Sequence, residues 1–311
     1  MRFNSNKMKK ITSCLAVFLL VTAISQAQQK LQLNLKKGRS YKQVTYNDAS
    51  ITQNIMGQDL KITLGVQSTM TFLVVNANRN DYDMEVSFDN MNLSMGSLQG
   101  NLEFDSENPA DDDAYSQIMS GVVGESFHIK MSRSGKVLEI SGIEAIWEAA
   151  FADQNISGSE KAQIMTQLNQ TYGSDAIKGN IEMVTAIFPE DKVSQGDRWT
   201  SEVEVNSGAK AIATNTYVYK GTQDGLHQIA GSGTITTSKE GTVINTNGME
   251  LTMNLNGTIE SEISVNAASG WIVKARINQK IDGTADIAGN AQMPDGFSIP
   301  MKIRNEMTIT N

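Results

Sequence analysis

Apolar and polar residues alternate along several long stretches of this chain. Between residues 60 and 74 the apolar residues occupy even positions: Leu60, Ile62, Leu64, Val66, Met70, Phe72 and Val74. A period of two is typical of a β-strand with one buried face. The alternation resumes after a turn-rich stretch at residues 76–81, in Tyr82, Met84, Val86 and Phe88, so we expect a β-hairpin here.

The same pattern returns near the C-terminus. Apolar residues alternate with polar ones over residues 249–265, a turn follows at residues 267–270, and further alternating runs cover residues 271–281 and 299–309. Strands of about sixteen residues would be roughly 50 Å long, so the sheet that contains them must twist and curl. A curled sheet with one apolar face needs a cover over that face.

The middle of the chain has helical spacing instead. Ile143, Ile146, Trp147, Ala150 and Phe151 form one apolar stripe. A second stripe holds Ile164, Leu168 and Tyr172, with Ser157 or Ser159 as the expected N-cap and Gly173 as the stop. A third stripe holds Ile177, Ile181, Val184 and Ile187 and ends before Pro189. The pattern predicts three short amphipathic helices.

Together these patterns predict an α+β protein that is mostly β. We expect long curled antiparallel sheet or sheets, similar to half a barrel, with a three-helix insert in the middle of the chain. Residues 28–311 are expected to form one β-rich domain, made of a first β half (28–140), the helical insert (141–188) and a second β half (189–311).

Residues 1–27 have the pattern of a cleaved export signal. Basic residues precede an apolar run at residues 15–21, and Ser25-Gln26-Ala27 is a small-x-small cleavage site. The run is too short for a permanent anchor, so we expect cleavage near Ala27 and no membrane span in the mature chain. The only cysteine, Cys14, would leave with the signal.

Removal of the signal also changes the net charge of the chain. Four basic residues and no acidic residue leave with it, which moves the formal net charge from −8 to −12. A charge this negative argues against nucleic acid as a partner.

The chemistry-bearing residues do not form a recognisable catalytic pattern. The two histidines, His128 and His227, are far apart, and we expect both to be solvent-exposed, His128 on an outer strand face and His227 in a turn. No serine-hydrolase elbow, phosphate loop or dinucleotide motif is present. The sequence therefore predicts no enzyme, no catalytic residue and no cofactor.

The densest charge lies in residues 105–113. Asp111 and Asp113 are the candidates for a calcium site, because calcium prefers carboxylate oxygens. The run lacks the spaced acidic order of a calcium loop, so a solvated connecting loop is the favoured interpretation and no metal site is predicted.

Methionine is unusually frequent on the predicted inner faces of the strands. Methionine is flexible and polarisable, which suits the binding of acyl chains and other irregular apolar ligands. The inner-face residues that we select as ligand-binding candidates are Met70, Phe72, Met84, Met253, Leu255 and Trp271. An ordinary filled core explains the same residues equally simply.

Three short glycine-aromatic segments give the chain a resemblance to a known family. They are Leu35-Lys36-Lys37-Gly38-Arg39-Ser40-Tyr41, the run from Phe188 to Trp199 that ends in Gly196-Asp197-Arg198-Trp199, and Ser269-Gly270-Trp271. They resemble DUF6263, a family of exported bacterial proteins without an assigned activity. The resemblance implies a Bacteroidota-like envelope protein and supplies no catalytic residues. At the level of fold, the expected architecture also resembles the half-barrels of lipoprotein and lipid carriers.

Two functional hypotheses follow. The first is an exported, non-enzymatic protein of the periplasm or the extracellular space that binds a lipid-like or other apolar ligand between curled sheet and helices. The alternative is a structural or protein-interaction module of the cell envelope with a solid core and no small ligand. The hydrophobic pattern alone does not separate the two, because periodicity does not report whether an apolar face is filled.

Overall fold

The computed structural model describes residues 28–98, 100–109, 114–151, 158–206, 209–238, 243–246, 249–289 and 296–311. Thirteen strands lie in this part of the chain. They are β1 (Ser40–Ile55), β2 (Gln58–Ala77), β3 (Asp81–Ser97), β4 (Gly100–Asp105), β5 (Ser126–Ser132), β6 (Val137–Ser141), β7 (Arg198–Asn206), β8 (Lys210–Gln223), β9 (Leu226–Thr237), β10 (Val243–Thr246), β11 (Met249–Asn266), β12 (Ile272–Ile287) and β13 (Phe297–Thr310). Four helices accompany them: α1 (Ala114–Ser120), α2 (Ile143–Ala150), α3 (Gly158–Tyr172) and α4 (Ser174–Thr185).

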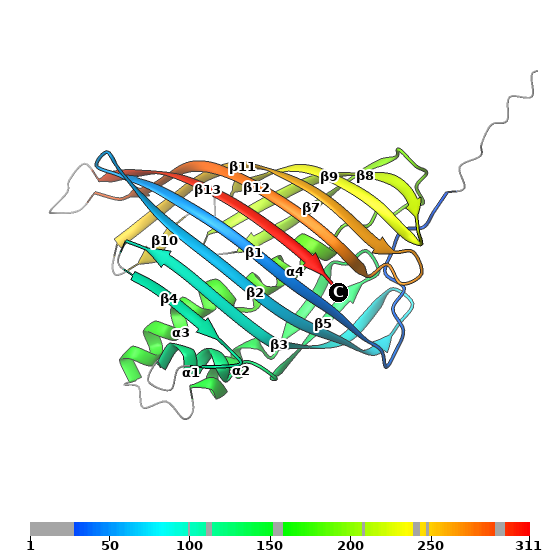
Figure 1. Ribbon diagram of the computed structural model, residues 1–311, viewed down its shortest axis with the longest axis horizontal. Helices are drawn as coiled ribbons and strands as arrows, with labels where there is room; N and C mark the ends of the chain where they lie inside the picture. The colour runs from blue at the N-terminus through cyan, green and yellow to red at the C-terminus, as the bar shows by residue number, and fades with distance from the viewer. Residues whose placement is uncertain are drawn as a thin grey trace, which may run out of the picture.

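All the strands belong to one curled antiparallel sheet (Figure 1). Its order is β6-β5-β3-β2-β1-β13-β12-β11-β9-β8-β7, with β4 paired to β3 and β10 paired to β11. The first and last strands, β1 and β13, lie side by side in the centre, while β6 and β7 form the two edges. Within the described ranges these edges do not pair with each other, so the sheet is open. The predicted mostly-β, half-barrel-like fold is confirmed.

The long strands follow the alternation in the sequence. In β2 the even-numbered residues Met70, Phe72 and Val74 are buried. Lys61 and Thr63, which alternate with the apolar residues near the start of the strand, are exposed. β2 and β3 pair as the expected hairpin, and β11 and β12 pair after the turn at residues 267–270. We call the face that carries Met70, Phe72 and Val74 the inner face and the opposite one the outer face.

The three expected helices of the insert are present, and a fourth helix precedes β5. The predicted stop at Gly173 is confirmed, because α3 ends at Tyr172 and Gly173 separates it from α4. Of the two expected N-caps, Ser159 lies inside α3, and Ser157 is outside the described residues. Sequence analysis missed α1, which has only seven residues but buries Ile118 and Met119.

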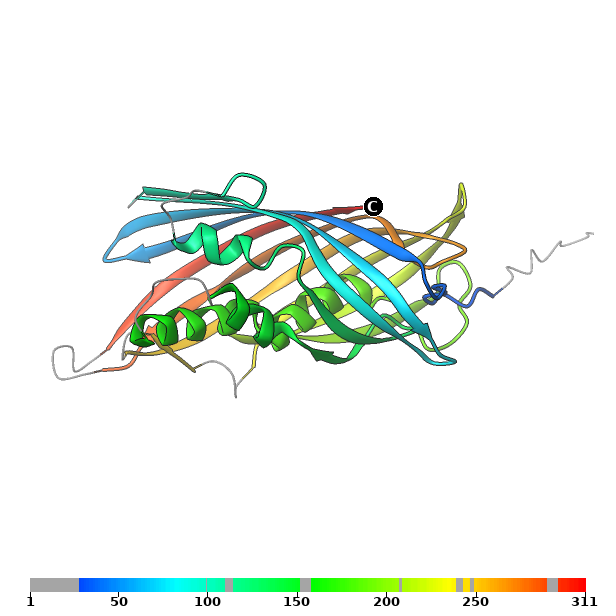
Figure 2. The same ribbon diagram turned by 90° about the horizontal axis from the view of Figure 1, so that it is seen from below.

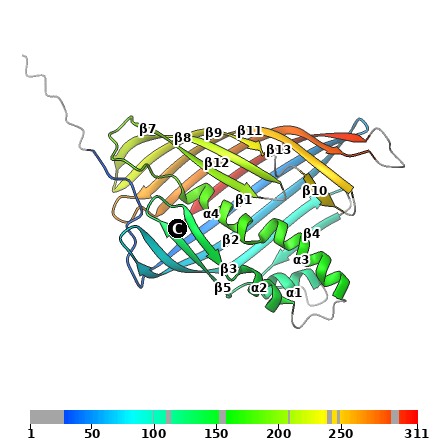
Figure 3. The same ribbon diagram turned by 180° about the vertical axis from the view of Figure 1, so that it is seen from behind.

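The helices lie on the concave, inner side of the sheet (Figures 2 and 3). Helix α4 packs against both edges of the sheet, β6 and β7. It comes so close to β7 that a Cβ atom at Gly179 would lie 2.7 Å from the carbonyl oxygen of Glu204. No helix in the described part of the chain is both long and apolar enough to cross a bilayer.

Hydrogen bonds fasten α4 and the residues after it to both edges. On the β6 side, the backbone N–H of Val137 donates to Glu182 Oε1 at 2.7 Å, and the hydroxyl of Thr185 donates to the carbonyl of Gly135 at 2.6 Å. On the β7 side, Ser201 donates to the carbonyl of Ala186 at 2.7 Å. The end of the insert thus spans the gap between the two edges.

One hydrophobic core joins the helices to part of the inner face. Phe72, Tyr82 and Phe127 are fully buried in it, together with Trp147 of α2 and Ile181 of α4. The extended N-terminal segment adds Leu31, Leu33 and Leu35, which are 1–4% exposed. Burying this apolar area is the main contribution to the stability of the fold.

Candidate functional site: the open end of the inner face

The strand register sorts the inner face into rows of neighbouring side chains. One row runs Ile62–Ile51–Ile303–Ile281 across β2, β1, β13 and β12, because each residue is the direct partner of the next. Directly opposite residues in an antiparallel pair present their side chains to the same face, with Cβ atoms about 5 Å apart. Four isoleucines therefore form a continuous apolar strip in the middle of the sheet.

Further apolar rows follow towards the turn at residues 56–57 and the end of β12 at Ile287. These rows contain Leu60, Met301 and Leu255, then Ile299, Ala285 and Met253, and then Ile287 and Leu251. We call the surface formed by the isoleucine row and these rows the open end. Most of its side chains are partly exposed, and Met95 on β3 beside it is 38% exposed.

The open end lies largely outside the hydrophobic core, against which its residue Ile281 packs. Ile51, Ile62, Ile303, Met253 and Leu255 are neither buried in the core cluster nor packed against it in the described part of the chain. Met301 is buried, at 7% exposed, yet it too lies outside the core cluster. Within the described part of the chain, the inner face thus carries apolar side chains that stay partly exposed outside the core.

A polar row marks the boundary between the open end and the core. Asn305 and Gln279 are direct partners on β13 and β12, and the Asn305 amide nitrogen donates to Gln279 Oε1 at 2.9 Å. Among the described residues, the side-chain oxygen of Asn305 is one of four buried side-chain oxygens without a hydrogen-bond partner. Each unpaired buried acceptor destabilises a fold by about 1–3 kcal/mol, so this row is a poorly satisfied part of the inner face.

Beyond the polar row lies what we call the closed end, where the core covers the inner face. Met70, Phe72, Met84 and Trp271 are all 0–9% exposed here. The ring centroids of Phe72 and Trp271 are 5.1 Å apart in an edge-on arrangement, and the Trp271 indole donates to the carbonyl of Lys42 at 2.8 Å. These side chains are surrounded by other protein side chains.

The six residues selected from the sequence therefore divide into two groups. Met70, Phe72, Met84 and Trp271 lie in the closed end, and only Met253 and Leu255 lie in the open end. The strip that connects these two to β1 and β2 was missed: Ile51, Ile62, Ile281 and Ile303. The alternation of apolar and polar residues in β2 indicated that Ile62 lies on the inner face. The pairing between β1 and β13, which brings the isoleucines into one row, could not be derived from the sequence.

The described residues contain no group of three or more His, Cys, Asp or Glu side chains that could hold a metal ion. Asp111 and Asp113, the calcium candidates, lie outside the described residues. His128 is exposed on β5, as expected.

His227 was expected in an exposed turn, and this prediction is wrong. The turn is made by Asp224 and Gly225, both at positive φ, and β9 already begins at Leu226. His227 is therefore an inner-face residue, 8% exposed, with its Nδ1 at 2.8 Å from the Thr222 hydroxyl and 3.0 Å from the Tyr219 hydroxyl. Burial lowers its pKa from the ordinary value of 6.5.

Glu182 is a second buried polar residue that sequence analysis missed. It is 9% exposed on α4, and desolvation raises its pKa above the ordinary value of 4.5, although the hydrogen bond from Val137 N–H opposes this shift. An acid between Ile181 and Met183 on an apolar helix was the available signal. Because Glu182 pairs with the free edge of β6, its evident role is to hold α4 in place.

The curled open sheet with helices on its concave face defines a class of β-rich half-barrel proteins. Within this class, residues 79–272 match the model of a family described as "Family of unknown function (DUF6263)", and the chain belongs to this family. The matched region runs from the β2–β3 turn to the start of β12, so it includes the whole helical insert. Two of the three segments that carried the resemblance, residues 188–199 and 269–271, lie inside it.

Several solved structures match this chain at low sequence identity. Lipovitellin, in a structure titled "Lipid-protein interactions in lipovitellin", is 10% identical, with a TM-score of 0.43 over 88% of this chain and 25% of that chain. This chain thus spans about a quarter of the lipovitellin chain. An outer membrane channel from Pseudomonas putida F1 is 7% identical, with a TM-score of 0.28 over 89% of this chain and 97% of that one.

A third similar structure is a DUF1329 family protein from Desulfovibrio piger. It is 12% identical, with a TM-score of 0.13 over 86% of this chain and 84% of that one. The search of curated proteins finds no match to the sequence.

Proposed function

We propose that this protein is an exported, non-enzymatic protein of the cell envelope that binds an apolar ligand at the open end of the inner face. One observation carries the proposal: Ile51, Ile62, Ile303, Met253 and Leu255 lie on the concave face of the sheet without belonging to the core. Contiguous apolar side chains without a cover are typical of ligand or partner sites. Covering them recovers about 0.8 kcal/mol for each CH₂ group removed from water.

The chemistry of the open end suits a flexible hydrocarbon. Met253 and Met301 can adapt their side chains to an irregular ligand, whereas the four isoleucines have restricted rotamers and provide a firm floor. No charged side chain lies in the isoleucine row. An acyl chain or a similarly elongated apolar molecule is therefore the ligand class that we favour.

Export is the second part of the proposal. Residues 1–27 carry the pattern of a cleavable signal, which supports a periplasmic or extracellular location. Apolar ligands need a protein carrier when they move through an aqueous compartment of the envelope.

Native mass spectrometry and a fluorescent fatty acid test the proposal together. Protein purified from its own cells should carry a co-purified apolar molecule, and the delipidated protein should bind the fluorescent fatty acid. Ile303→Asn should weaken this binding at least tenfold, because it places an amide in the isoleucine row. Lys302→Asn is the matched control, since Lys302 is the adjacent, exposed outer-face residue of the same strand.

Two results would contradict apolar binding: wild-type protein that is free of ligand and does not take up the probe, or equal binding by both variants. Circular dichroism on each variant separates lost binding from lost folding.

A structural or interaction module is the second candidate function. It is favoured by the closed end, where four of the six selected residues are packed into solid core. Under this alternative the open end would be covered by an envelope protein, and a stoichiometric partner should co-purify while the fluorescent fatty acid does not bind.

A further inference from the structure

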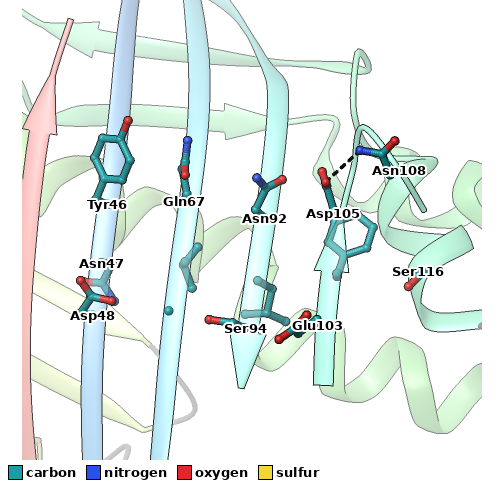
Figure 4. Close-up of a pocket in the computed structure, with 14 residues that line it drawn as sticks. Tyr46, Asn47, Asp48, Gln67, Asn92, Ser94, Glu103, Asp105, Asn108 and Ser116 are labelled. Atoms are coloured by element: carbon teal, nitrogen blue, oxygen red, sulfur yellow. Dashed lines mark hydrogen bonds between the residues drawn. The ribbon is translucent and has the colours of Figure 1, made fainter. Parts of the chain in front are cut away.

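The outer face carries a groove with chemistry unlike that of the inner face. Tyr46, Gln67, Asn92 and Asp105 form one register row across β1, β2, β3 and β4, because each is the direct partner of the next. All four belong to the wall of a cavity of about 530 Å³, and Figure 4 shows Tyr46, Gln67 and Asn92 side by side on neighbouring strands. A cavity of this size is in the range of small-molecule sites.

A second polar row lies directly beside the first. It runs Asp48–Gly65–Ser94–Glu103 across the same four strands. The Ser94 side chain lies over Gly65, because a Cβ atom at Gly65 would lie only 2.6 Å from Ser94 Oγ and 3.6 Å from Asp48 Oδ1. The polar side chains of this row thus gather around a residue that has no side chain of its own.

The side chains of the groove offer both donors and acceptors of hydrogen bonds. Gln67 and Asn92 carry amides, Ser94 a hydroxyl, and Asp48 and Glu103 carboxylates. A carboxylate accepts strong hydrogen bonds from hydroxyl groups, and an amide both donates and accepts. A ligand with many hydroxyl groups satisfies such a mixed set.

At one end of the groove, hydrogen bonds hold the ionised carboxylate of Asp105 in place. The Asn108 amide donates to Asp105 Oδ2 at 3.1 Å, and the backbone N–H of Glu107 donates to Asp105 Oδ1 at 3.0 Å (Figure 4). These hydrogen bonds lower the pKa of Asp105, the Asn108 contribution being the largest. Asp105 is thus a preorganised acceptor.

The other end carries an exposed aromatic ring. Tyr46 is 44% exposed, and no other large aromatic side chain is exposed to this extent in the described part of the chain. An exposed tyrosine presents an apolar ring face together with a hydroxyl group. The C–H face of a sugar ring stacks on such a ring, while the sugar hydroxyls reach the neighbouring polar row.

Charge and spacing argue against two other ligand classes, namely anions and single metal cations. Asp48, Glu103 and Asp105 repel phosphates and carboxylates. Asp48 and Glu103 lie three strand spacings apart, about 14 Å, so they do not converge on one cation, and the described residues hold no metal-binding group of three. The distance of about 14 Å between Asp48 and Glu103 also suits an oligosaccharide of two or three linked sugar rings.

We propose that this groove is a carbohydrate-binding site for a short neutral oligosaccharide, with Tyr46 as the stacking platform and Gln67, Asn92 and Asp105 as the hydroxyl-binding row. The site lies on the opposite face of the sheet from the open end. It is therefore independent of apolar binding, and either site can fail without the other.

Isothermal titration with maltotriose, cellotriose and chitotriose tests the site. At least one of the three should bind the wild-type protein, and Tyr46→Ala and Gln67→Ala should each weaken that binding tenfold or more. Lys302→Ala, an outer-face change away from the groove, should leave it unchanged. Because Tyr46 is exposed, its removal should not unfold the protein, which a thermal melt verifies.

Three results would overturn the assignment. One is no binding of any of the three sugars at 10 mM or below, on the order of the weakest affinities of specific sites. Another is equal weakening by Lys302→Ala and Tyr46→Ala. The third is preferential binding of spermidine, which would identify the groove as a site for organic cations.

Discussion

The closed and open ends of the inner face belong to the same strands and have the same alternation, yet only one of them is packed. On β13, Ile309 is 1% exposed in the core, whereas Ile303, six residues earlier on the same face, lies outside the core. The difference comes from what lies above the sheet. Periodicity in a sequence reports which face a side chain occupies and does not report whether that face is covered.

The cover of the closed end comes from distant parts of the chain. The N-terminal segment crosses it with Leu31, Leu33 and Leu35, and is held by hydrogen bonds from Leu33 N–H to the carbonyl of Arg133 at 2.8 Å and from Asn34 N–H to the carbonyl of Ser269 at 2.7 Å. The residues that follow α4 add the buried side chain of Ile187 to this cover. In the described part of the chain, the open end has no comparable cover.

A matched pair of substitutions on β13 gives the largest expected contrast between the two ends. Ile309→Ala should reduce the free energy of unfolding by about 2–5 kcal/mol, because it leaves a cavity in a closed core. Ile303→Ala should cost about 1 kcal/mol or less, because water already reaches this side chain. Urea denaturation of both variants measures the difference, and equal losses would contradict the division of the inner face.

The N-terminal cover can be weakened through one hydroxyl group. Tyr82 is fully buried, and its hydroxyl donates to the carbonyl of Leu33 at 3.0 Å while accepting from the N–H of Leu35 at 3.1 Å and from Arg133 at 2.8 Å. Tyr82→Phe should cost about 1–3 kcal/mol, because these groups lose their partner inside the protein.

Amide exchange sharpens this second test. Exchange at Leu33 and Leu35 should accelerate in Tyr82→Phe, while exchange in β11 at the open end should not. Tyr46→Phe, which removes a hydroxyl from an exposed side chain, is the matched control. A variant in which both regions exchange faster together would argue for one cooperative unit.

The sequence predicted the strands, the hairpins and the helical insert, because one-sided strands and amphipathic helices have strong local periods. It did not predict that β1 and β13 pair in the centre of the sheet, since pairing between residues 250 positions apart leaves no local signal. The outer groove was missed for the same reason: Tyr46 and Asp105 enter one row only through the pairing of four strands. His227 was misplaced because the turn already ends at Gly225 and β9 begins at Leu226.

Helix α4 and the residues after it span the gap between the edge strands β6 and β7. The stability that this connection gives the fold should depend on pH through Glu182. Its folded-state pKa is raised, so the folded protein binds more protons than the unfolded chain between the ordinary value of 4.5 and the raised pKa. Stability should therefore increase as pH falls through this window. Glu182→Gln keeps an acceptor for Val137 N–H and removes the ionisation, so its melting temperature should lose this pH dependence.

Glu182→Ala is the comparison variant for Glu182→Gln. It should be less stable than Glu182→Gln at every pH, because the N–H of Val137 is left without its acceptor. Parallel pH profiles for wild type and Glu182→Gln would remove Glu182 as the source of the effect.

The smallest expected effect concerns His227 at the closed end. Its pKa is lowered in the folded state, so the unfolded chain binds more protons below the ordinary value of 6.5. Stability from this group is fully present above that value and is lost as pH falls through it. His227→Asn should flatten the melting-temperature profile between pH 5 and pH 7, and an unchanged profile would show that the imidazole stays accessible to protons.

The central position of β13 determines when the sheet can assemble. Without residues 297–310, the strands on either side, β1 and β12, would each present a full row of unpaired backbone groups, and the sheet would divide into two ribbons connected only through the helical insert and the core. Such long unprotected edges readily pair with other chains. The hydrogen-bonded sheet is therefore complete only when residues 297–310 are in place, and their removal should be far more harmful than their number suggests.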